Sequence, residues 1–386
     1  MTMAYYYHLG SVPRKRHTQF RAPDGSLYCE ELFGTESFDG IYSLLYHRFP
    51  PTSVTSFSKL QTRVQDEWEI NEHRHHHLKT SGIRADGGIL DGRVPLFYNE
   101  DVSISILGHV PPTDAFFRNG TADELFFVHR GEGTLTSVFG MQSFRIGDYL
   151  YIPRGTTYQL QSSEDSRFLL VESPSAIKIP KRYRNEFGQL VESAPYYTRS
   201  IRPPERLVTK EERGEFRIAV KLGESHAAFT SDHHPFDVVG WDGYLYPFSL
   251  NVNELSPIVG KLHQPPTVHE TFSGERFMVG TFAPRLFDFD PEAVPVPYYH
   301  NNIDSDEIIF YSGGSFMSRR GIEEGSITLH RRGVHHGPQP GVVEESLGKK
   351  STDELAVMVE AYKPFKLTSF AKSVDDPSYQ LSWAIK

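Results

Sequence analysis

The chain has 386 residues, a formal net charge of −9 and one cysteine, Cys29. This length allows two domains or one large pseudo-symmetric domain, and a single cysteine excludes an intramolecular disulfide. The lysines and arginines form no run, so neither nucleic acid nor an anionic membrane is expected as a partner. Because no stretch of roughly 20 apolar residues is present and residues 1–10 do not resemble a signal peptide, we expect a soluble protein of the cytoplasm.

Short segments rich in β-branched and aromatic residues recur along the chain, separated by Gly, Pro, Asn and Asp. In chain order, the expected strands include 125–129, 134–139, 149–152, 168–172, 277–282, 307–311, 326–330 and 355–362. Helical periodicity of any length is hard to find. With 13% aromatic residues, 31 glycines and 26 prolines, the pattern predicts an all-β, jelly-roll-like architecture.

An internal repeat links the two groups of strands. The first copy occupies 123–131 and 147–158, and the second occupies 306–314 and 325–336. Each copy begins with Asp-Glu, and a glycine follows seven positions after the Glu. Each then has a second glycine, a Pro or Arg six positions later, and a third glycine two positions beyond. Two such patterns in the same order predict a duplicated β unit.

Potential metal ligands are present in the second copy alone. His300 precedes Glu307 by seven positions, and His336 follows the last glycine of the motif by three. At the matching positions the first copy has Phe117 and Tyr158, which cannot replace the two imidazoles. The sequence therefore places the candidate metal site in the C-terminal half of the chain.

The two motifs resemble those of the cupin superfamily, in which hairpins facing each other across a small barrel direct their ligands into its lumen. The resemblance implies a bicupin, with a domain at 1–200 that lacks ligands and a domain at 201–386 that carries them. Two imidazoles and one carboxylate occupy one face of an octahedron and leave the other positions open. This arrangement is typical of non-haem Fe(II) oxygenases.

Longer stretches carry a second resemblance. They are VPYYHNN at 296–302, LH at 329–330, HHGP at 335–338 and PFDVVGWDGYLYP at 235–247, with GSVPRKRHT at 10–18 and LYCEELFG at 27–34. Together they resemble the homogentisate 1,2-dioxygenase family. The resemblance runs over nearly the whole chain and is most specific around residues 235–340.

This family resemblance implies roles for individual residues. The implied Fe(II) ligands are His300, Glu307 and His336. A base or hydrogen-bonding role is implied for His263, because a neutral imidazole can accept a phenol proton near neutral pH. Contacts with the substrate are implied for Tyr298, His330 and His336, since Tyr298 lies two positions before one ligand and His330 lies six before another.

The chain departs from the better-known family members at three places. Six residues separate His300 from Glu307, whereas five intervene in those members, so Asp306 stays an alternative carboxylate ligand. The spacing within the motif and the comparison with the first copy favour Glu307. Phe316 takes the place of a substrate-contacting Tyr. Arg319 lies near a family Lys and could bind a substrate carboxylate bidentately.

The resemblance implies that O₂ opens homogentisate to maleylacetoacetate, as in tyrosine and phenylalanine catabolism, in a trimer or a hexamer made of trimers. A related hydroquinone or gentisate-like substrate is one alternative. A metal-dependent cupin isomerase or epimerase, often containing zinc, is another. A non-catalytic bicupin that stores or senses a ligand is a third.

Other noticeable residues are expected to have structural roles. The run at 73–77, with four histidines, is predicted to be an exposed polar turn, because it has no regular ligand spacing. The pair at 233–234 and His269 are expected to be loop or packing histidines. Arg154 and Arg332 take matching turn positions in the two copies, which indicates a role in the turn.

Overall fold

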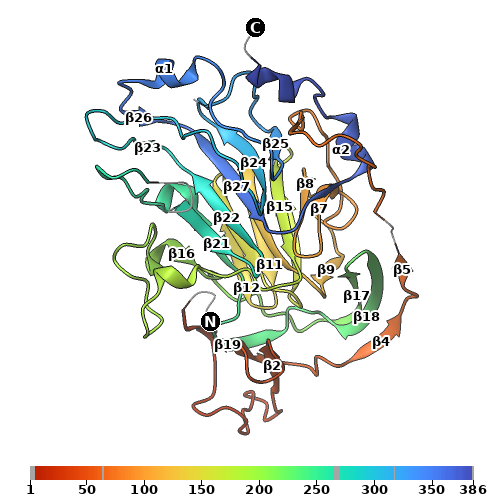
Figure 1. Ribbon diagram of the computed structural model, residues 1–386. Coiled ribbons are helices and arrows are strands. Elements are labelled where there is room, and N and C mark those ends of the chain that lie inside the picture. The colour runs from red at the N-terminus through yellow and green to blue at the C-terminus, as the bar shows by residue number, and fades with distance from the viewer. Residues whose placement is uncertain (1–4, 63–64, 265–268, 317, 385–386) are drawn as a thin grey trace.

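The computed structural model describes residues 5–62, 65–264, 269–316 and 318–384. Strands dominate these residues, which confirms the expected all-β fold (Figure 1). The helices are α1 (Val342–Ser346), α2 (Ser369–Ser373) and the 3-10 turns Lys181–Tyr183, Thr198–Ser200, Val252–Glu254 and Tyr379–Trp383. In the described part of the chain, no helix is long and apolar enough to cross a membrane.

The first barrel is built from two sheets that pack face to face. One sheet has the order β16 (Ile201–Arg202), β20 (Phe248–Asn251), β13 (Asp148–Ile152), β10 (Asp123–Arg130), β15 (Arg167–Ser173), β8 (Ser103–Leu107), β7 (Val94–Tyr98) and β28 (Lys366–Leu367). The other has the order β12 (Gly140–Phe144), β11 (Gly133–Ser137), β14 (Thr157–Ser162), β9 (Phe116–Asn119), β17 (Arg213–Leu222), β18 (Ser225–His233) and β4 (Val54–Phe57), with β5 (Gln61–Thr62) beside β18. A buried apolar cluster from both sheets fills the space between them.

The second barrel is centred on a six-stranded sheet. Its order is β21 (Glu270–Ser273), β22 (Phe277–Phe282), β27 (Leu355–Ala361), β24 (Asp306–Gly313), β25 (Ile327–His330) and β6 (His76–Leu78). A short pair, β23 (Arg285–Leu286) and β26 (Ser351–Thr352), lies nearby. The order β25–β24–β27–β22 repeats the order β13–β10–β15–β8 of the first barrel, as the duplication predicts.

A smaller sheet contains the N-terminal residues. Its order is β1 (Tyr7–Gly10), β19 (Val238–Gly243), β3 (Tyr42–His47) and β2 (Cys29–Gly34). In Figure 1, β19 and β2 of this sheet lie at the bottom of the molecule, opposite the C-terminus at the top. Strand β19 lies between two N-terminal strands, so segments about 200 residues apart in the sequence share one sheet.

The two barrels share one core because side chains alternate along β10 and β24. Phe127 on β10 meets Phe310 on β24, with ring centroids 6.2 Å apart, and both belong to the largest buried cluster. The neighbouring Phe126 points instead into the filled interior of the first barrel, whereas Ile309 points into the second. Since successive side chains on a strand point to opposite faces, each strand serves the shared core and one interior.

A division of the chain at residue 200 stays a prediction. Hydrogen bonding joins the two expected domains across that point: β20 pairs with β13, and β17 pairs with β9. From before residue 200, β6 pairs with β25 of the second barrel. Each barrel therefore uses strands from both sides of the expected boundary.

A buried histidine ties the N-terminal sheet together. His47 on β3 lies between two carboxylates, with Nδ1 2.7 Å from Oδ1 of Asp237 and Nε2 2.8 Å from Oε2 of Glu31. Burial alone would lower the pKa of His47, but the hydrogen bonds with Asp237 and Glu31 outweigh it and raise the pKa to about 9. Both ring nitrogens therefore donate hydrogen bonds at neutral pH.

We expect the contribution of His47 to stability to depend on pH. Because its pKa rises from 6.5 to about 9 on folding, the contribution is complete below pH 6.5 and is lost as the pH rises through about 9. The loss should be about 2 kcal/mol, since partial exposure of Glu31 weakens the pairing. The check is the free energy of unfolding of the wild type and His47→Gln at several pH values. A difference between the two that does not change with pH would contradict the assignment.

Candidate metal centre

The three candidate ligands come together where β24 begins and β25 ends, inside the six-stranded sheet. Glu307 is the second residue of β24, His300 lies in the segment before that strand, and His336 follows the turn after β25. The backbones of His300 and His336 exchange two hydrogen bonds of 2.9 Å. One ligand atom from each of the three residues lies within 4.8 Å of the others, which is compact enough to surround a single cation.

The two imidazoles are held so that one nitrogen of each can bind a metal. Nδ1 of His300 lies 3.0 Å from the carbonyl oxygen of Tyr298, and Nδ1 of His336 lies 3.2 Å from that of Val334. A carbonyl accepts the hydrogen on Nδ1 and leaves the lone pair on Nε2. Nε2 of His336 is buried without a hydrogen-bond partner among the described residues, 3.7 Å from Oε1 of Glu307. A buried ring nitrogen that has no hydrogen-bond partner and lies beside a carboxylate is suited to bind a metal ion.

The protonation states also suit a divalent cation. Burial would raise the pKa of Glu307, but the hydrogen bond with His330 and the nearby imidazoles hold it well below its ordinary value. Burial lowers the pKa of His336 to about 4, against the opposing effect of Glu307. The carboxylate is therefore ionised and the imidazole neutral near pH 7. Metal ligands need these forms, so no proton has to be displaced at that pH.

The alternative carboxylate, Asp306, is engaged elsewhere. Its oxygens accept hydrogen bonds from the backbone N of Arg332 (3.1 Å), from Nε of Arg332 (3.1 Å) and from the backbone N of Phe365 (3.0 Å). In the first barrel, Arg154 makes the same backbone and Nε contacts with Asp123. These contacts agree with the predicted turn role of the two arginines, and they leave Glu307 as the carboxylate of the cluster.

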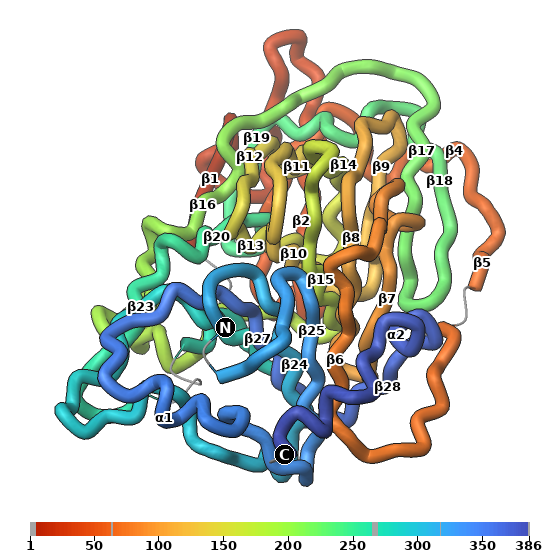
Figure 2. Tube along the Cα trace, turned by 90° about the horizontal axis from the view of Figure 1, so that it is seen from above, coloured from red at the N-terminus to blue at the C-terminus, as the bar shows by residue number. Residues whose placement is uncertain are grey.

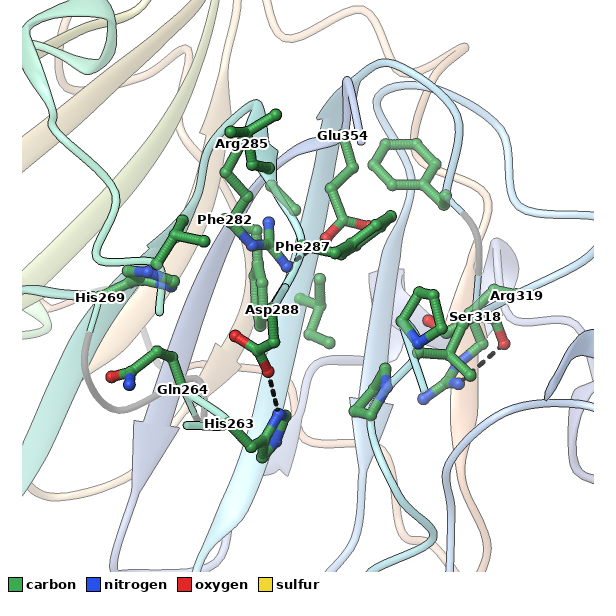
Figure 3. Close-up of a pocket in the computed structure, with 18 of the residues that line it drawn as sticks. His263, Gln264, His269, Phe282, Arg285, Phe287, Asp288, Ser318, Arg319 and Glu354 are labelled. Atoms are coloured by element: carbon green, nitrogen blue, oxygen red, sulfur yellow. Dashed lines mark hydrogen bonds and ion pairs between the residues drawn. The ribbon is translucent and has the colours of Figure 1, made fainter. Parts of the chain in front are cut away.

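His300 and Glu307 line a pocket whose walls are partly apolar and partly polar (Figure 3). Ring and aliphatic side chains form much of the lining, namely Phe282, Phe287, Ile309, Tyr311 and Phe316. Polar groups stand on two sides: His263 and Asp288 on one, Ser318 and Arg319 on the other. The pocket can therefore accept a planar apolar molecule that carries polar substituents at opposite ends.

His263 lies at the pocket wall with a fixed orientation. Its Nδ1 is 2.7 Å from Oδ2 of Asp288, and its ring packs on that of Tyr298 with centroids 5.2 Å apart. Tyr298 is largely exposed. The prolines at 265 and 266, which belong to the sequence motif around His263, lie outside the described residues.

Arg319 is buried and also lines the pocket. One of its terminal nitrogens, Nη1, donates to the carbonyl oxygens of Ser318 (3.1 Å) and Gly337. Its Nε is buried without a hydrogen-bond partner in the described part of the chain. The guanidinium packs over the ring of Trp383, 5.2 Å from the centroid. A buried cation with an unused donor at a pocket wall is suited to bind an anionic group.

His330 lies behind the cluster and is not among the residues that line the pocket. Its Nδ1 is 2.6 Å from Oε1 of Glu307, and its Nε2 is 3.0 Å from the hydroxyl of Tyr379. Its ring stacks on that of His336, with centroids 4.5 Å apart. A contact between His330 and substrate stays a prediction, whereas its contact with the carboxylate is a feature of the fold.

The prediction of an exposed turn at 73–77 is wrong for three of its histidines. His75, His76 and His77 are buried, because β6 pairs with the edge strand β25. His75 packs edge-on against both His330 and His336, with centroids 5.2 Å away in each case. It therefore belongs to the surroundings of the cluster, although its distance along the chain hid this from sequence reasoning.

The other histidines divide between packing and the pocket. As expected, the pair at 233–234 packs against rings, His233 on Phe49 and His234 on Phe116. His269 lines the pocket instead, and burial lowers its pKa to about 4. The aromatic residues Tyr379 and Trp383, which pack around His330, carried no signal in the sequence.

In the first barrel an arginine stands at the position that corresponds to the cluster. Glu124 matches Glu307, and its carboxylate forms an ion pair of 2.7 Å with Nη2 of the buried Arg93. Nη1 of Arg93 pairs with Glu172 at 2.8 Å, and the guanidinium lies 4.8 Å from the centroid of Phe117. The hydroxyl of Tyr158 donates to Glu124 (2.8 Å). A side-chain cation thus neutralises the carboxylate in the barrel that lacks the two histidines.

The chain is similar to several known proteins. A family model described as "Homogentisate 1,2-dioxygenase N-terminal" matches residues 103–252. A protein of Saccharolobus solfataricus with the name "putative dioxygenase" is 49% identical over 99% of this chain and 99% of its own length. Homogentisate 1,2-dioxygenase of Bradyrhizobium diazoefficiens is 27% identical over 67% of this chain and only 60% of its own length. A cupin 2 conserved barrel domain protein from Leptotrichia buccalis superposes with a TM-score of 0.33 and 6% identity, over 72% of this chain and 91% of that one.

Separate substitutions of Glu307 and Asp306 should show which of the two carboxylates binds the metal and which stabilises the turn. Glu307→Gln should lose stoichiometric binding of Fe(II) or Co(II), because it removes the carboxylate of the cluster. Asp306→Asn should keep metal binding but lower the free energy of unfolding by about 1–3 kcal/mol, because buried backbone donors lose a charged acceptor. Calorimetric titration with metal and urea unfolding test both. The opposite pattern would make Asp306 the ligand.

Arg93→Met should strongly destabilise the first barrel. The substitution leaves the carboxylates of Glu124 and Glu172 buried with less positive charge, at a cost of about 3–5 kcal/mol. Arg130→Met is the matched control, because its ion pair with Glu324 is half-exposed and should contribute less than about 1 kcal/mol. Urea unfolding measures both. Equal losses would show that Arg93 has no special role.

Proposed function

Because the chain belongs to the homogentisate 1,2-dioxygenase family, as a distant relative of the enzymes that carry that name, we propose that it is an Fe(II)-dependent dioxygenase that opens the ring of homogentisate. The observation that carries the proposal is the cluster of His300, Glu307 and His336 beside a pocket lined by both apolar and polar side chains. These three residues would hold Fe(II). When bound, the metal would supply the redox chemistry through which both atoms of O₂ enter the product.

The pocket supports an aromatic substrate. Phe282, Phe316 and Tyr311 contribute rings to the lining, so a flat ring can be enclosed by apolar surface. Enclosure removes water from the ring and from the polar groups around it. Hydrogen bonds and charges inside the pocket are thereby strengthened relative to bulk solvent.

His263 is proposed as the group that accepts a proton from a ring hydroxyl. Asp288 accepts the hydrogen of its Nδ1, which leaves the lone pair on Nε2 for the substrate. Loss of the hydroxyl proton makes the ring more electron-rich and more reactive toward O₂. Tyr298, packed on the imidazole, would keep the base in place.

Arg319 is proposed as the site for the carboxylate of the substrate. Its unused Nε donor and its buried positive charge suit an anionic side arm. The arm would then anchor the ring between the arginine and the metal cluster. Holding the ring in one orientation removes part of the entropic cost of the reaction.

A related hydroquinone or gentisate-like acid is the second candidate substrate, and Phe316 is the observation that favours it. Its ring packs on Tyr311, with centroids 4.6 Å apart, and it has no hydroxyl for a hydrogen bond with substrate. An isomerase would use the same cluster without O₂, and oxygen consumption separates it from a dioxygenase. A trimeric or hexameric assembly and a cytoplasmic location stay predictions from the family resemblance.

The test is anaerobic reconstitution with Fe(II), followed by oxygen uptake with homogentisate, gentisate and plain hydroquinone in parallel. We expect one O₂ to be consumed for each homogentisate opened. Arg319→Met should raise the KM for homogentisate by roughly 10- to 100-fold, because a charged hydrogen bond is lost. The KM for hydroquinone, which lacks a carboxylate, should stay nearly constant. No uptake with any of the three substrates would overturn the proposal.

A further inference from the structure

A chain of hydrogen bonds leads from the metal cluster to the C-terminal segment. Oε1 of Glu307 is 2.6 Å from Nδ1 of His330, and Nε2 of the same ring is 3.0 Å from the hydroxyl of Tyr379. All three side chains are buried. The proposed function does not use Tyr379, whose hydroxyl also interacts with Arg319 and Thr328.

The direction of each hydrogen bond follows from the chemistry of the groups. An ionised carboxylate only accepts, so Nδ1 of His330 carries the hydrogen that it donates to Glu307. A neutral ring with hydrogen on Nδ1 has a lone pair on Nε2. The hydroxyl of Tyr379 therefore donates to Nε2, and both nitrogens of His330 are occupied.

These two hydrogen bonds matter because His330 is a third imidazole beside the cluster. Its ring stacks on the ligand His336, with centroids 4.5 Å apart and 23° between the ring planes. A small rotation or a change of tautomer could offer a nitrogen of His330 to a metal bound there. An additional protein ligand would fill a position that substrate or O₂ requires in a site of this type.

The 3-10 turn Tyr379–Trp383 is anchored on both sides of the cluster. Nε1 of Trp383 donates to the carbonyl oxygen of Gly337 (3.0 Å), the residue after His336. The side chain of Gln380 accepts from the backbone N of His75 (2.9 Å). Figure 2 shows the C-terminal end on the side of the molecule where β6 lies. These contacts hold the Tyr379 hydroxyl against His330.

We propose that Tyr379 is a positioning residue of the metal centre, whose hydroxyl keeps His330 bonded to Glu307 and outside the set of metal ligands. The inference rests on the proposed metal site and adds a residue to it. Groups that orient a ligand commonly change metal affinity by 10- to 100-fold when they are removed. Tyr379→Phe removes one oxygen and keeps the ring packing. Because the hydroxyl also interacts with Arg319 and Thr328, a His330→Phe background is needed to separate its bond with His330 from these other contacts.

The test uses the full-length protein with Co(II), which reports its ligands in the visible spectrum. We expect Tyr379→Phe to bind Co(II) about tenfold more weakly than the wild type, with a changed spectrum. Tyr149→Phe is the matched control: this buried hydroxyl lies 2.8 Å from Oγ1 of Thr281 and belongs neither to the cluster nor to the pocket lining, so its loss should leave affinity and spectrum unchanged. In a His330→Phe background, Tyr379→Phe should have no further effect. Wild-type affinity and spectrum in Tyr379→Phe would overturn the inference.

A measurement on the wild type gives an independent check that does not depend on a variant folding. In the NMR spectrum of the Co(II)-loaded protein, each metal-bound imidazole gives one exchangeable, strongly shifted N–H signal. We expect two such signals, from His300 and His336. A third signal would place His330 among the ligands and overturn this inference alone. Failure of the wild type to bind Co(II) would overturn the proposed metal site, and this inference with it.

Discussion

The alternation of side chains along β10 and β24 is the constraint on which the rest of the structure depends. Phe127 and Phe310 join the two barrels through one buried core, because each lies on the face of its strand that points toward the other barrel. The acidic residues Glu124 and Glu307 are thereby directed into the two interiors. A shift of either strand by one residue would exchange these faces and place a carboxylate in the apolar core.

A buried carboxylate in each interior requires compensation, and the two barrels differ in how they provide it. In the first barrel Arg93 supplies the positive charge and aromatic side chains fill the space. In the second barrel two imidazoles approach Glu307, and a pocket opens beside them. Closely similar strand pairing thus produces a packed interior in the first barrel and a pocket beside the candidate metal site in the second.

The sequence was sufficient to predict the all-β fold, the repeat and the cluster, because each depends on local order: Asp-Glu at the start of a strand, a glycine turn, and a histidine at fixed spacing. It was insufficient for Arg93, His75 and Tyr379. These residues reach their sites through pairing between distant segments, such as β6 with β25 across about 250 residues. Composition made the histidine run look exposed, whereas the strand pairing buries it. The motif spacing already favoured Glu307 over Asp306, and the structure adds the reason: Asp306 is engaged by the turn at Arg332.

The ion pair of Arg93 has a consequence for the life of the protein in the cell. A charge supplied by a side chain is present as soon as the chain folds, whereas a charge supplied by a metal ion arrives afterwards. The charges of the first barrel are therefore balanced without any metal. If the second barrel holds the proposed metal, scarcity of that metal would leave a folded protein that can still be loaded, instead of a misfolded one.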